Sequence, residues 1–530
     1  MTESNPSSQS TQDTAPEYRK RNRSKKPLII TIALIAVAAL VAAVIFWLGR
    51  DQGSRTDEGE TGEGGQTVAP ASLTVGLQLE PTNLDIRTTG GVALDQILID
   101  NVYQGLVGLA SGTVDEYVPV IAAELPKVSD DALTYTFTLR DGVTFASGNA
   151  LTADDVVDSL SATLTAEVIG TDSTVAALDE RTIEIHLASA NSQFLWHLAN
   201  RPGLIFESAY TGDLANTTNG TGPFTLNQWI EGDSITFVAV DSYWGDPSAL
   251  SEVVWRYIPD PNAAVNAALE GDVDVLAPVR SDMVSQFDGS GFTLDRAAST
   301  DVFTLAYNNQ KAPLDDVRVR SALSMAIDSE SIIATFYGDG KALGGPITDI
   351  EPAYEDLTAI NAYDPDAAKA LLEEAGVSDL ALTVTVANFY DSAALNQVVT
   401  QFAEIGVTLT INSVEFGTWL NDVYIGKDFD LSYVNHAEAN DFVNYTNPGY
   451  YFGYNNPEVQ ALYAQSITAA DQAAAADLVK QAAHLVAEDA PARWLINYTP
   501  TNAIAAHVSG FPNSNTNSRI NLSGVTATAE

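Results

Sequence analysis

Cysteine is absent from the sequence, which excludes disulfide bonds, thiolate metal sites and cysteine nucleophiles. Histidine is nearly as scarce: the five histidines are isolated, and neither an HExxH pattern nor a close pair indicates a metal site. The glycine loop that binds phosphate and the Gly-x-Ser-x-Gly motif of serine hydrolases are also missing. We therefore expect no cofactor, and any hydrolytic chemistry would have to rest on paired carboxylates.

Basic residues are few as well. The 530 residues include 25 lysines and arginines against 69 aspartates and glutamates, which gives a formal net charge of -44. Such a field repels phosphate backbones and attracts cationic solutes, although acidic side chains on an exposed surface also serve solubility. Nucleic acid is therefore excluded as a partner, and we expect a soluble, monomeric body.

The longest apolar run is Leu28–Leu48, 21 residues whose only polar side chain is Thr31. A helix of this length spans about 30 Å, the thickness of the hydrocarbon core of a membrane. Residues 1–27 form a basic tail and residues 49–70 an acidic, glycine-rich linker, so the positive-inside rule predicts a cytoplasmic N-terminus and an extracytoplasmic body. A cleaved signal peptide is the alternative interpretation of the apolar run.

The stretch Val302–Asp328 is the one around which the chain is organised. The alternation of residues 302–307 predicts a strand, and Pro313 prevents its continuation as an interior strand. Asp315 and Asp316 place negative charge at a helix start, and apolar residues then recur at three- and four-residue spacing. The pattern predicts a strand followed by a core helix.

Other patterns predict more elements of the same kind. Apolar residues at helical spacing indicate a helix over residues 92–109. Thr152 and Asp155 are spaced as a capping pair, and Asp364 followed by Pro365 marks another helix start. Strands that alternate with helices in the second half of the chain predict an α/β lobe.

Several motifs in this chain are specific enough to indicate a family. They are Tyr-Asn-Asn and Pro-Leu-Asp-Asp-Val-Arg-Val-Arg, which follow the strand ending at Tyr307, Arg-Asp-Gly-Val-x-Phe-x-x-Gly and Leu-Thr-Ala-Asp-Asp-Val, which follow Leu139, and Glu-Gly-Asp-Val-Asp, which begins at Glu270. Together they resemble the extracytoplasmic solute-binding proteins of peptide and nickel ABC importers, known as family 5. The resemblance extends from Leu73 to Phe511.

The resemblance implies an α/β fold of the periplasmic-binding-protein-like type II, with two main lobes, an additional small subdomain and a cleft between the lobes. The implied boundaries are 71–100, 222–305 and 495–530 for main lobe I, 101–221 for the small outer subdomain, and 306–494 for lobe II.

The same resemblance implies a substrate-binding component of an ABC importer and not an enzyme. It would capture a small solute, a peptide or another amine-bearing molecule, outside the cytoplasmic membrane and deliver it to permease and ATPase subunits. The N-terminal helix would hold the protein at the membrane in place of a lipidated cysteine. Two alternatives stay open: a membrane-anchored surface hydrolase that uses paired carboxylates, and a ligand-sensing ectodomain.

Polar residues follow the strand-like segment 429–434, and ligand groups of α/β proteins often lie at such strand ends. In the relatives this region supplies an acid for the amino terminus of the ligand and a tryptophan that packs over it. Here His436-Ala437-Glu438 departs from the Trp-x-x-Asp arrangement of the family. A solvated polar loop and a core position for the tryptophan are the alternatives. The candidate ligand residues of this region are Trp419, Tyr433, Asn435, His436, Glu438 and Asp441.

Four weaker candidates lie elsewhere in the chain. Asn308 and Asn309 end the strand of the central stretch and could donate to a ligand, although asparagines at strand ends also form turns. Thr88 and Thr89 lie in the loop after the first predicted strand, which the resemblance places at the cleft.

Overall fold

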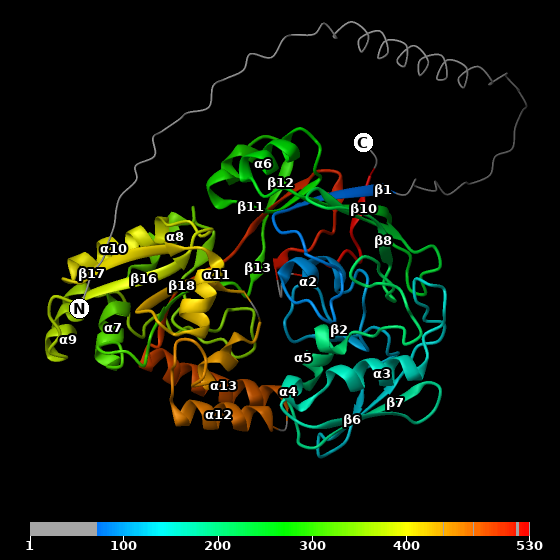
Figure 1. Ribbon diagram of the computed structural model, residues 1–530, viewed down its shortest axis with the longest axis horizontal. Coiled ribbons are helices and arrows are strands. Elements are labelled where there is room, and N and C mark those ends of the chain that lie inside the picture. Colours follow the sequence, from blue (N-terminus) through cyan, green and yellow to red (C-terminus); the bar gives the residue numbers. More distant parts are fainter. Residues whose placement is uncertain (1–70, 438, 470, 516–518, 529–530) are drawn as a thin grey trace, which may run out of the picture. The chain divides into compact units, whose positions relative to one another are not determined.

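The computed structural model describes residues 71–437, 439–469, 471–515 and 519–528, and Ala69–Glu530 form one compact unit. Three large sheets organise this unit (Figure 1). We call the regions built on them lobe I, the outer subdomain and lobe II. The predicted segment 28–48 lies outside the described residues, and no helix within them is long and apolar enough to cross a membrane.

Lobe I is built on a seven-stranded sheet in which the first strand is central. The parallel neighbours of β1 are β10 and β11, whereas β9, β8 and β20 join in antiparallel pairs. The strands, in sheet order, are β12 (Phe292–Arg296), β20 (Thr501–Ala505), β11 (Val275–Val279), β1 (Ala71–Leu77), β10 (Leu250–Tyr257), β9 (Ser234–Ala239) and β8 (Phe224–Ile230). The helices are α2 (Val92–Leu98), α6 (Pro261–Leu269) and the 3-10 helix η2 (Ser281–Phe287).

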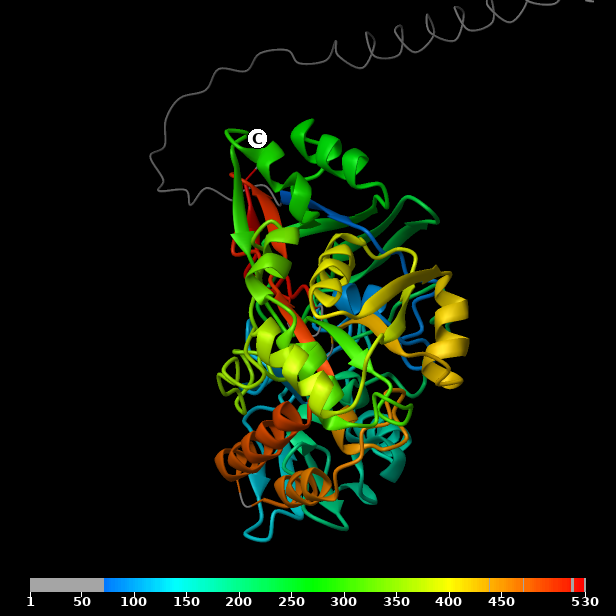
Figure 2. The same cartoon turned by 90° about the vertical axis from the view of Figure 1, so that its left-hand side faces the viewer.

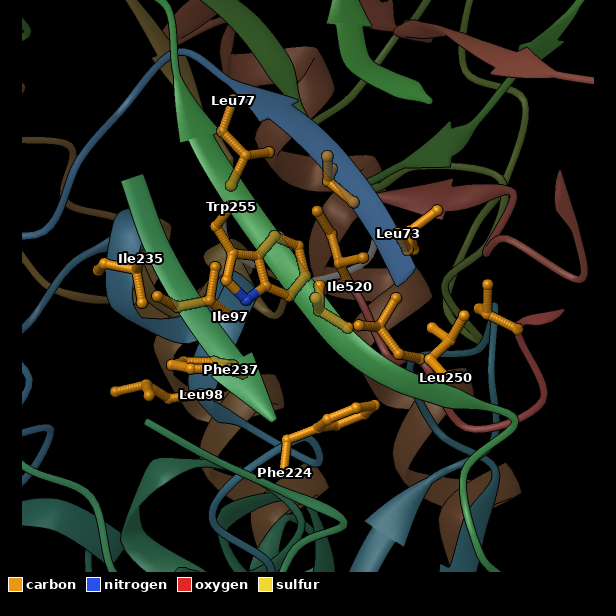
Figure 3. Close-up of a cluster of buried hydrophobic side chains, with 14 of the residues drawn as sticks. Leu73, Leu77, Ile97, Leu98, Phe224, Ile235, Phe237, Leu250, Trp255 and Ile520 are labelled. Atoms are coloured by element: carbon orange, nitrogen blue, oxygen red, sulfur yellow. The ribbon is translucent and has the colours of Figure 1, made fainter. Parts of the chain in front are cut away.

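The core of lobe I joins residues that are far apart in the sequence. Figure 3 shows Trp255 of β10 and Phe237 of β9 on the same face as Ile97 of α2, with Ile520 from the C-terminal segment nearby. The rings of Trp255 and Phe237 meet edge to face at 6.3 Å between centroids. This core ties both ends of the described chain into one lobe.

The predicted helix over residues 92–109 was wrong in its extent. Helix α2 ends at Leu98, because Asp100 adopts a left-handed backbone conformation with φ 67 and residues 107–109 form strand β2. A helix cannot continue through such a residue without strain. The apolar side chains beyond the helix end are nevertheless buried, so their helical spacing comes from burial in a turn and a strand.

The outer subdomain is inserted into lobe I through a narrow stem. The backbone N–H of Phe224 donates to the carbonyl of Asn101 at 3.0 Å, so the chain leaves and re-enters lobe I at adjacent points. The four-stranded sheet contains, in order, β4 (Lys127–Val128), β5 (Thr134–Thr138), β7 (Thr182–Leu187) and β6 (Ser173–Ala177). Around it lie α3 (Ala153–Thr163), α4 (Ala166–Ile169), α5 (Phe194–Leu198), the 3-10 helix η1 (Arg201–Gly203) and the pair β2 (Val107–Leu109) and β3 (Tyr117–Pro119). The predicted capping pair of Thr152 and Asp155 at the start of α3 is confirmed.

Lobe II is built on a six-stranded sheet. The strands, in sheet order, are β15 (Gly340–Lys341), β19 (Ala492–Tyr498), β14 (Val302–Tyr307), β18 (Leu431–His436), β16 (Ala381–Ala387) and β17 (Thr408–Val414). The helices are α7 (Val317–Met325), α8 (Ser329–Thr335), α9 (Pro365–Glu374), α10 (Ala393–Glu404), α11 (Phe416–Trp419), the π-helix η3 (Leu420–Ile425), the 3-10 helix η4 (Asp441–Thr446), α12 (Pro457–Ile467) and α13 (Gln472–Asp489). The predicted strand 302–307 is confirmed as β14, which is buried along its whole length, and Asp316 caps the helix that follows.

Two short stretches connect lobe I with lobe II, and we call residues 297–301 and 499–500 the crossover segments. The first runs from β12 to β14 and the second from β19 to β20, which Figure 2 shows as an orange-to-red ribbon passing between the two sheets. Ser299 donates its hydroxyl to the carbonyl of Tyr498 at 2.5 Å, and Asn497 donates to the carbonyls of Ser299 and Asp301. The two segments therefore support each other side by side. Two small strand pairs complete the fold: β13 (Ala298–Ser299) with β22 (Ser514–Asn515), and β21 (Val508–Ser509) with β23 (Thr526–Ala527).

Candidate functional site

Strand β18 carries most of the candidate residues and lies in the middle of the lobe II sheet. It pairs in parallel with β16 and antiparallel with β14. The register sets Val302, the first residue of β14, opposite both His436 and Asn497. The carboxyl ends of β16, β18 and β19 therefore lie at the sheet edge where the crossover segments begin. We call it the strand-end edge, and such edges are where α/β folds bind ligands.

His436 is held in a hydrogen-bonded group at this edge. Its Nδ1 lies 2.7 Å from Asp441 Oδ2, and its Nε2 lies 3.2 Å from the hydroxyl of Tyr451. Asn444 donates to the other carboxylate oxygen of Asp441 at 2.6 Å. Burial raises the pKa of Tyr451 well above its ordinary value, so the hydroxyl stays protonated and can donate to the imidazole. The contacts fix the turn after β18.

The loop after β18 also contacts the outer subdomain. Asn440, in the left-handed conformation, accepts a hydrogen bond from Gln193 Nε2 at 3.2 Å, and the same amide reaches the hydroxyl of Tyr463 in α12 at 3.1 Å. The backbone N–H of Asn440 donates to Glu351 at 3.4 Å, and burial raises the pKa of that carboxyl. Glu438, the predicted anchor, lies outside the described residues.

Asn435 links the end of β18 to the first crossover segment. Its Nδ2 donates to Asp301 Oδ2 at 3.4 Å, and its backbone N–H donates to the hydroxyl of Tyr390 at 3.1 Å. Asp301 is buried, and the sequence analysis did not identify it. A single acidic residue before a strand has no distinguishing pattern among 69 acids, so only its position beside β18 singles it out.

Trp419 and Tyr433 lie in the cores of lobe II. Trp419 is 6% exposed, donates its indole N–H to Ser432 at 3.0 Å and stacks on Phe416 at 5.9 Å. Tyr433 is buried and stacks on Phe303 at 5.5 Å. Phe416 itself is 49% exposed, so the aromatic group continues to the surface at a residue that the sequence analysis did not mention.

The four weaker candidates hold backbone in place. Asn308 donates to the carbonyls of Lys427 and Phe429, both at 3.0 Å, and Asn309 donates to three other carbonyls. Thr89 exchanges hydrogen bonds with Asn83 in the loop after β1, where the backbone N–H of Thr88 donates to the carbonyl of Asp85. None of these four lies in the hydrogen-bonded groups around β18 described above.

The described residues contain no group of three or more histidine, aspartate or glutamate side chains placed to hold a metal ion. The chemistry of the strand-end edge is therefore that of hydrogen-bond acceptors and carboxylates. Asp301, Asp441 and Glu351 all contact it, and its described polar side chains suit a ligand that donates hydrogen bonds.

Comparison with known proteins gives concordant results. Residues 116–458 match the bacterial extracellular solute-binding proteins, family 5 Middle. The dipeptide-binding protein of Escherichia coli (strain K12) is 30% identical over 382 residues, covering 64% of this chain and 71% of that protein. The heme-binding protein A of Haemophilus influenzae is 30% identical over 317 residues, covering 52% of this chain and 56% of that protein.

The fold comparison agrees with the sequence comparison. A periplasmic binding protein of Helicobacter pylori, solved in complex with the peptide STSA, superimposes with a TM-score of 0.74 at 21% identity and covers 88% of this chain and 99% of that one. The predicted periplasmic-binding-protein-like type II fold is thereby confirmed. The chain belongs to the family 5 bacterial extracellular solute-binding proteins.

Proposed function

We propose that this protein captures a peptide or another amine-bearing solute outside the cytoplasmic membrane and delivers it to the permease and ATPase subunits of an ABC importer. The observation that carries the proposal is the family match over residues 116–458, which includes the outer subdomain, β14 and β18 with its loop. Importer binding proteins perform no chemistry on the solute, so the surface hydrolase is not our proposal.

The two crossover segments suit a hinge. Domain closure needs a few residues that absorb backbone rotation between bodies that stay rigid, and lobes I and II are joined through 297–301 and 499–500. A solute shifts such an equilibrium by the difference between its affinities for the closed and open states. The strand-end edge adjoins the hinge, so a solute bound there contacts the part of lobe II nearest the rotation.

The acidic character of the strand-end edge supports an amine-bearing solute. Asp301, Asp441 and Glu351 contact it, and the whole chain has a net charge of -44. The printed names of similar proteins include dipeptide, nickel and heme binding, so family membership alone leaves the ligand class open. The residues we propose around the ligand are Asn435, His436, Glu438 and Asp441, with Trp419, Tyr433, Asn308, Asn309, Thr88 and Thr89 in supporting positions.

The N-terminal segment completes the proposal. The apolar run Leu28–Leu48 would anchor the protein in the cytoplasmic membrane, with residues 1–27 inside and the body outside. Residues 49–70 would serve as a flexible tether to the permease. Fractionation of cells with an antibody against the body, followed by alkaline extraction, separates an integral anchor from a cleaved signal peptide.

Identification of the bound solute is the direct test. The full-length protein is purified in detergent, denatured, and the released small molecules are identified by mass spectrometry and titrated back by calorimetry. A co-purifying amine that binds and is returned unchanged supports the proposal. Conversion of that molecule by the purified protein, lost on a single Asp or Glu substitution, would favour the hydrolase. Permease and ATPase reading frames beside the gene distinguish an importer from a sensor.

Glu438 provides a residue-level prediction. A charge-assisted hydrogen bond to an ammonium group contributes about 1.5 to 3 kcal/mol, so Glu438→Gln should weaken binding of the co-purified amine by about 10- to 150-fold. The Tm without ligand should stay the same. Asp441→Asn is the comparison variant, because that carboxylate is already bonded to His436 and Asn444. Equal affinities of wild type and Glu438→Gln in calorimetry would remove Glu438 from the site.

A further inference from the structure

Asp301 in the first crossover segment is a buried carboxyl group that lacks a cationic partner. It is 6% exposed, and among the described residues no lysine, arginine or histidine nitrogen lies within the 4.0 Å of an ion pair. Its Oδ1 has no hydrogen-bond partner there, and its Oδ2 accepts from Asn435 at 3.4 Å. Buried carboxylates in proteins are normally paired or hydrogen-bonded, so this group calls for an explanation.

Asn435 provides a second unpartnered acceptor beside the first. Its side-chain amide N–H donates to Asp301, whereas its own Oδ1 is buried and has no partner among the described residues. The side chains are in contact, so two acceptor oxygens without donors lie close together at the strand-end edge. A polar group that supplies several N–H donors would satisfy both, and a positively charged one would also neutralise the carboxylate.

The backbone around Asp301 is firmly held. Thr300 donates its hydroxyl to the carbonyl of Ala437 at 2.7 Å, which ties the crossover segment to the loop after β18. The carbonyl of Asp301 accepts from the backbone N–H of Tyr498 at 2.8 Å and from the side chain of Asn497 at 3.0 Å. The backbone groups therefore have their hydrogen bonds, and the unmet demand is confined to the two side chains.

Asp339 shows what a satisfied carboxyl group looks like in the same region. It is 1% exposed, forms an ion pair with Arg296 at 3.0 Å and accepts from the hydroxyl of Thr501 at 3.2 Å. Arg296 and Thr501 lie at the two ends of lobe I strands that lead into the crossover segments. The chain thus supplies a cation for Asp339 and none for Asp301.

We propose that Asp301 and Asn435 together anchor an ammonium or amidinium group of the bound solute. The inference rests on the proposed function and adds a second anchoring point to Glu438. An ammonium group has three N–H donors, enough for the two unpartnered oxygens and one further carboxylate. Because Asp301 belongs to the crossover segment, the same contact places the charge of the solute at the hinge.

Proton release accompanies binding at such an anchor. Burial raises the pKa of Asp301 to about 7, so the empty protein carries largely a protonated carboxyl group in acidic medium. When the solute ammonium arrives, the carboxyl group gives its proton to solvent and pairs as the carboxylate. The other titratable groups near it are Tyr390, Tyr498 and, across β14 and β18, His436 with Asp441. Burial raises the pKa of both tyrosines, which therefore stay neutral.

The test uses the full-length protein and two matched probes: an equimolar mixture of free-amine dipeptides, and the same mixture after N-acetylation. The free-amine mixture should bind wild type and Asp339→Asn with similar affinity, and Asp301→Asn should lose about 10- to 150-fold. Asn435→Ala removes one of the two acceptors and should lose about 2- to 12-fold. Calorimetry in two buffers of different ionisation enthalpy should show a released proton for wild type below pH 7 and none for Asp301→Asn.

The outcomes separate the anchor from the proposed function. Equal binding of the acetylated and free-amine mixtures would leave a solute-binding protein but overturn the anchor. An equal loss of affinity in Asp301→Asn and Asp339→Asn would also overturn it, because both changes would then act through the shape of the hinge. Binding of neither mixture, together with an uncharged co-purified solute, would reject the amine class of the proposed function and the anchor with it.

Discussion

The loop after β1 in lobe I and the strand-end edge of lobe II both carry acidic groups, but only the first supplies its own cations. Asp85 pairs with Arg87 at 2.8 Å, and Asp95 pairs with Arg201 at 2.6 Å. At the strand-end edge Asp301 has no cation among the described residues. The difference indicates that the lobe I loop is complete as folded, whereas the lobe II edge acquires its missing charge from a solute.

Trp419 tests whether the lobe II edge rests on a rigid core. The side chain is 6% exposed and hydrogen-bonded to Ser432, so Trp419→Ala should lower the free energy of unfolding by about 3 to 5 kcal/mol. Urea denaturation of the empty protein measures the loss. Phe416→Ala is the matched control, since that partner is 49% exposed and should cost less. A Trp419→Ala protein of unchanged stability with lost solute affinity would identify Trp419 as a ligand platform instead.

Asp301 without ligand provides the second largest effect. Because its folded pKa of about 7 lies above the ordinary 3.8, the stability that the protonated group provides is complete below pH 4 and is lost as pH rises through 7. Asp301→Asn removes this loss. The variant should therefore exceed wild type by up to about 4 kcal/mol at pH 8 and match it at pH 4. Denaturant melts at the two pH values measure the difference, and an equal gap at both would contradict the assignment.

Arg201 tests the other side of the comparison and has the smallest expected effect. Its guanidinium group contacts Asp95 and the carbonyl of Thr89, and burial already raises the pKa of Asp95. Arg201→Ala leaves these acceptors without their donor and should cost about 1 to 3 kcal/mol of stability. Solute affinity should stay within twofold, since the lobe I loop contributes structure. A large loss of affinity at unchanged Tm would place this loop in the binding site.

The sequence predicted what depends on neighbours in the chain. The capping pair at Thr152, strand β14 and the helix start at Asp316 follow from residues within one turn of each other, and the structure contains all three. Helix α2 was predicted too long because apolar residues recur at helical spacing beyond Leu98, where tertiary burial and the left-handed Asp100 decide the conformation.

The candidate site was predictable only in part for a similar reason. The polar cluster from Asn435 to Asp441 stands out because it directly follows a strand, and His436 and Asp441 are indeed bonded to each other. Asp301 and Gln193 are distant in sequence from that cluster, and only strand pairing and the contact of the outer subdomain bring them to it. Such contacts depend on topology, which local patterns do not encode.

The narrow stem of the outer subdomain has a consequence for the evolution of the family. Since the chain leaves lobe I at Asn101 and returns at Phe224 through a 3.0 Å hydrogen bond, a lineage can lengthen, trim or replace the 122 residues between them without disturbing the seven-stranded sheet. Gln193 on this insertion contacts Asn440 in the loop after β18. Exchange of one peripheral module would therefore diversify what the protein binds while its hinge and transport partner stay the same.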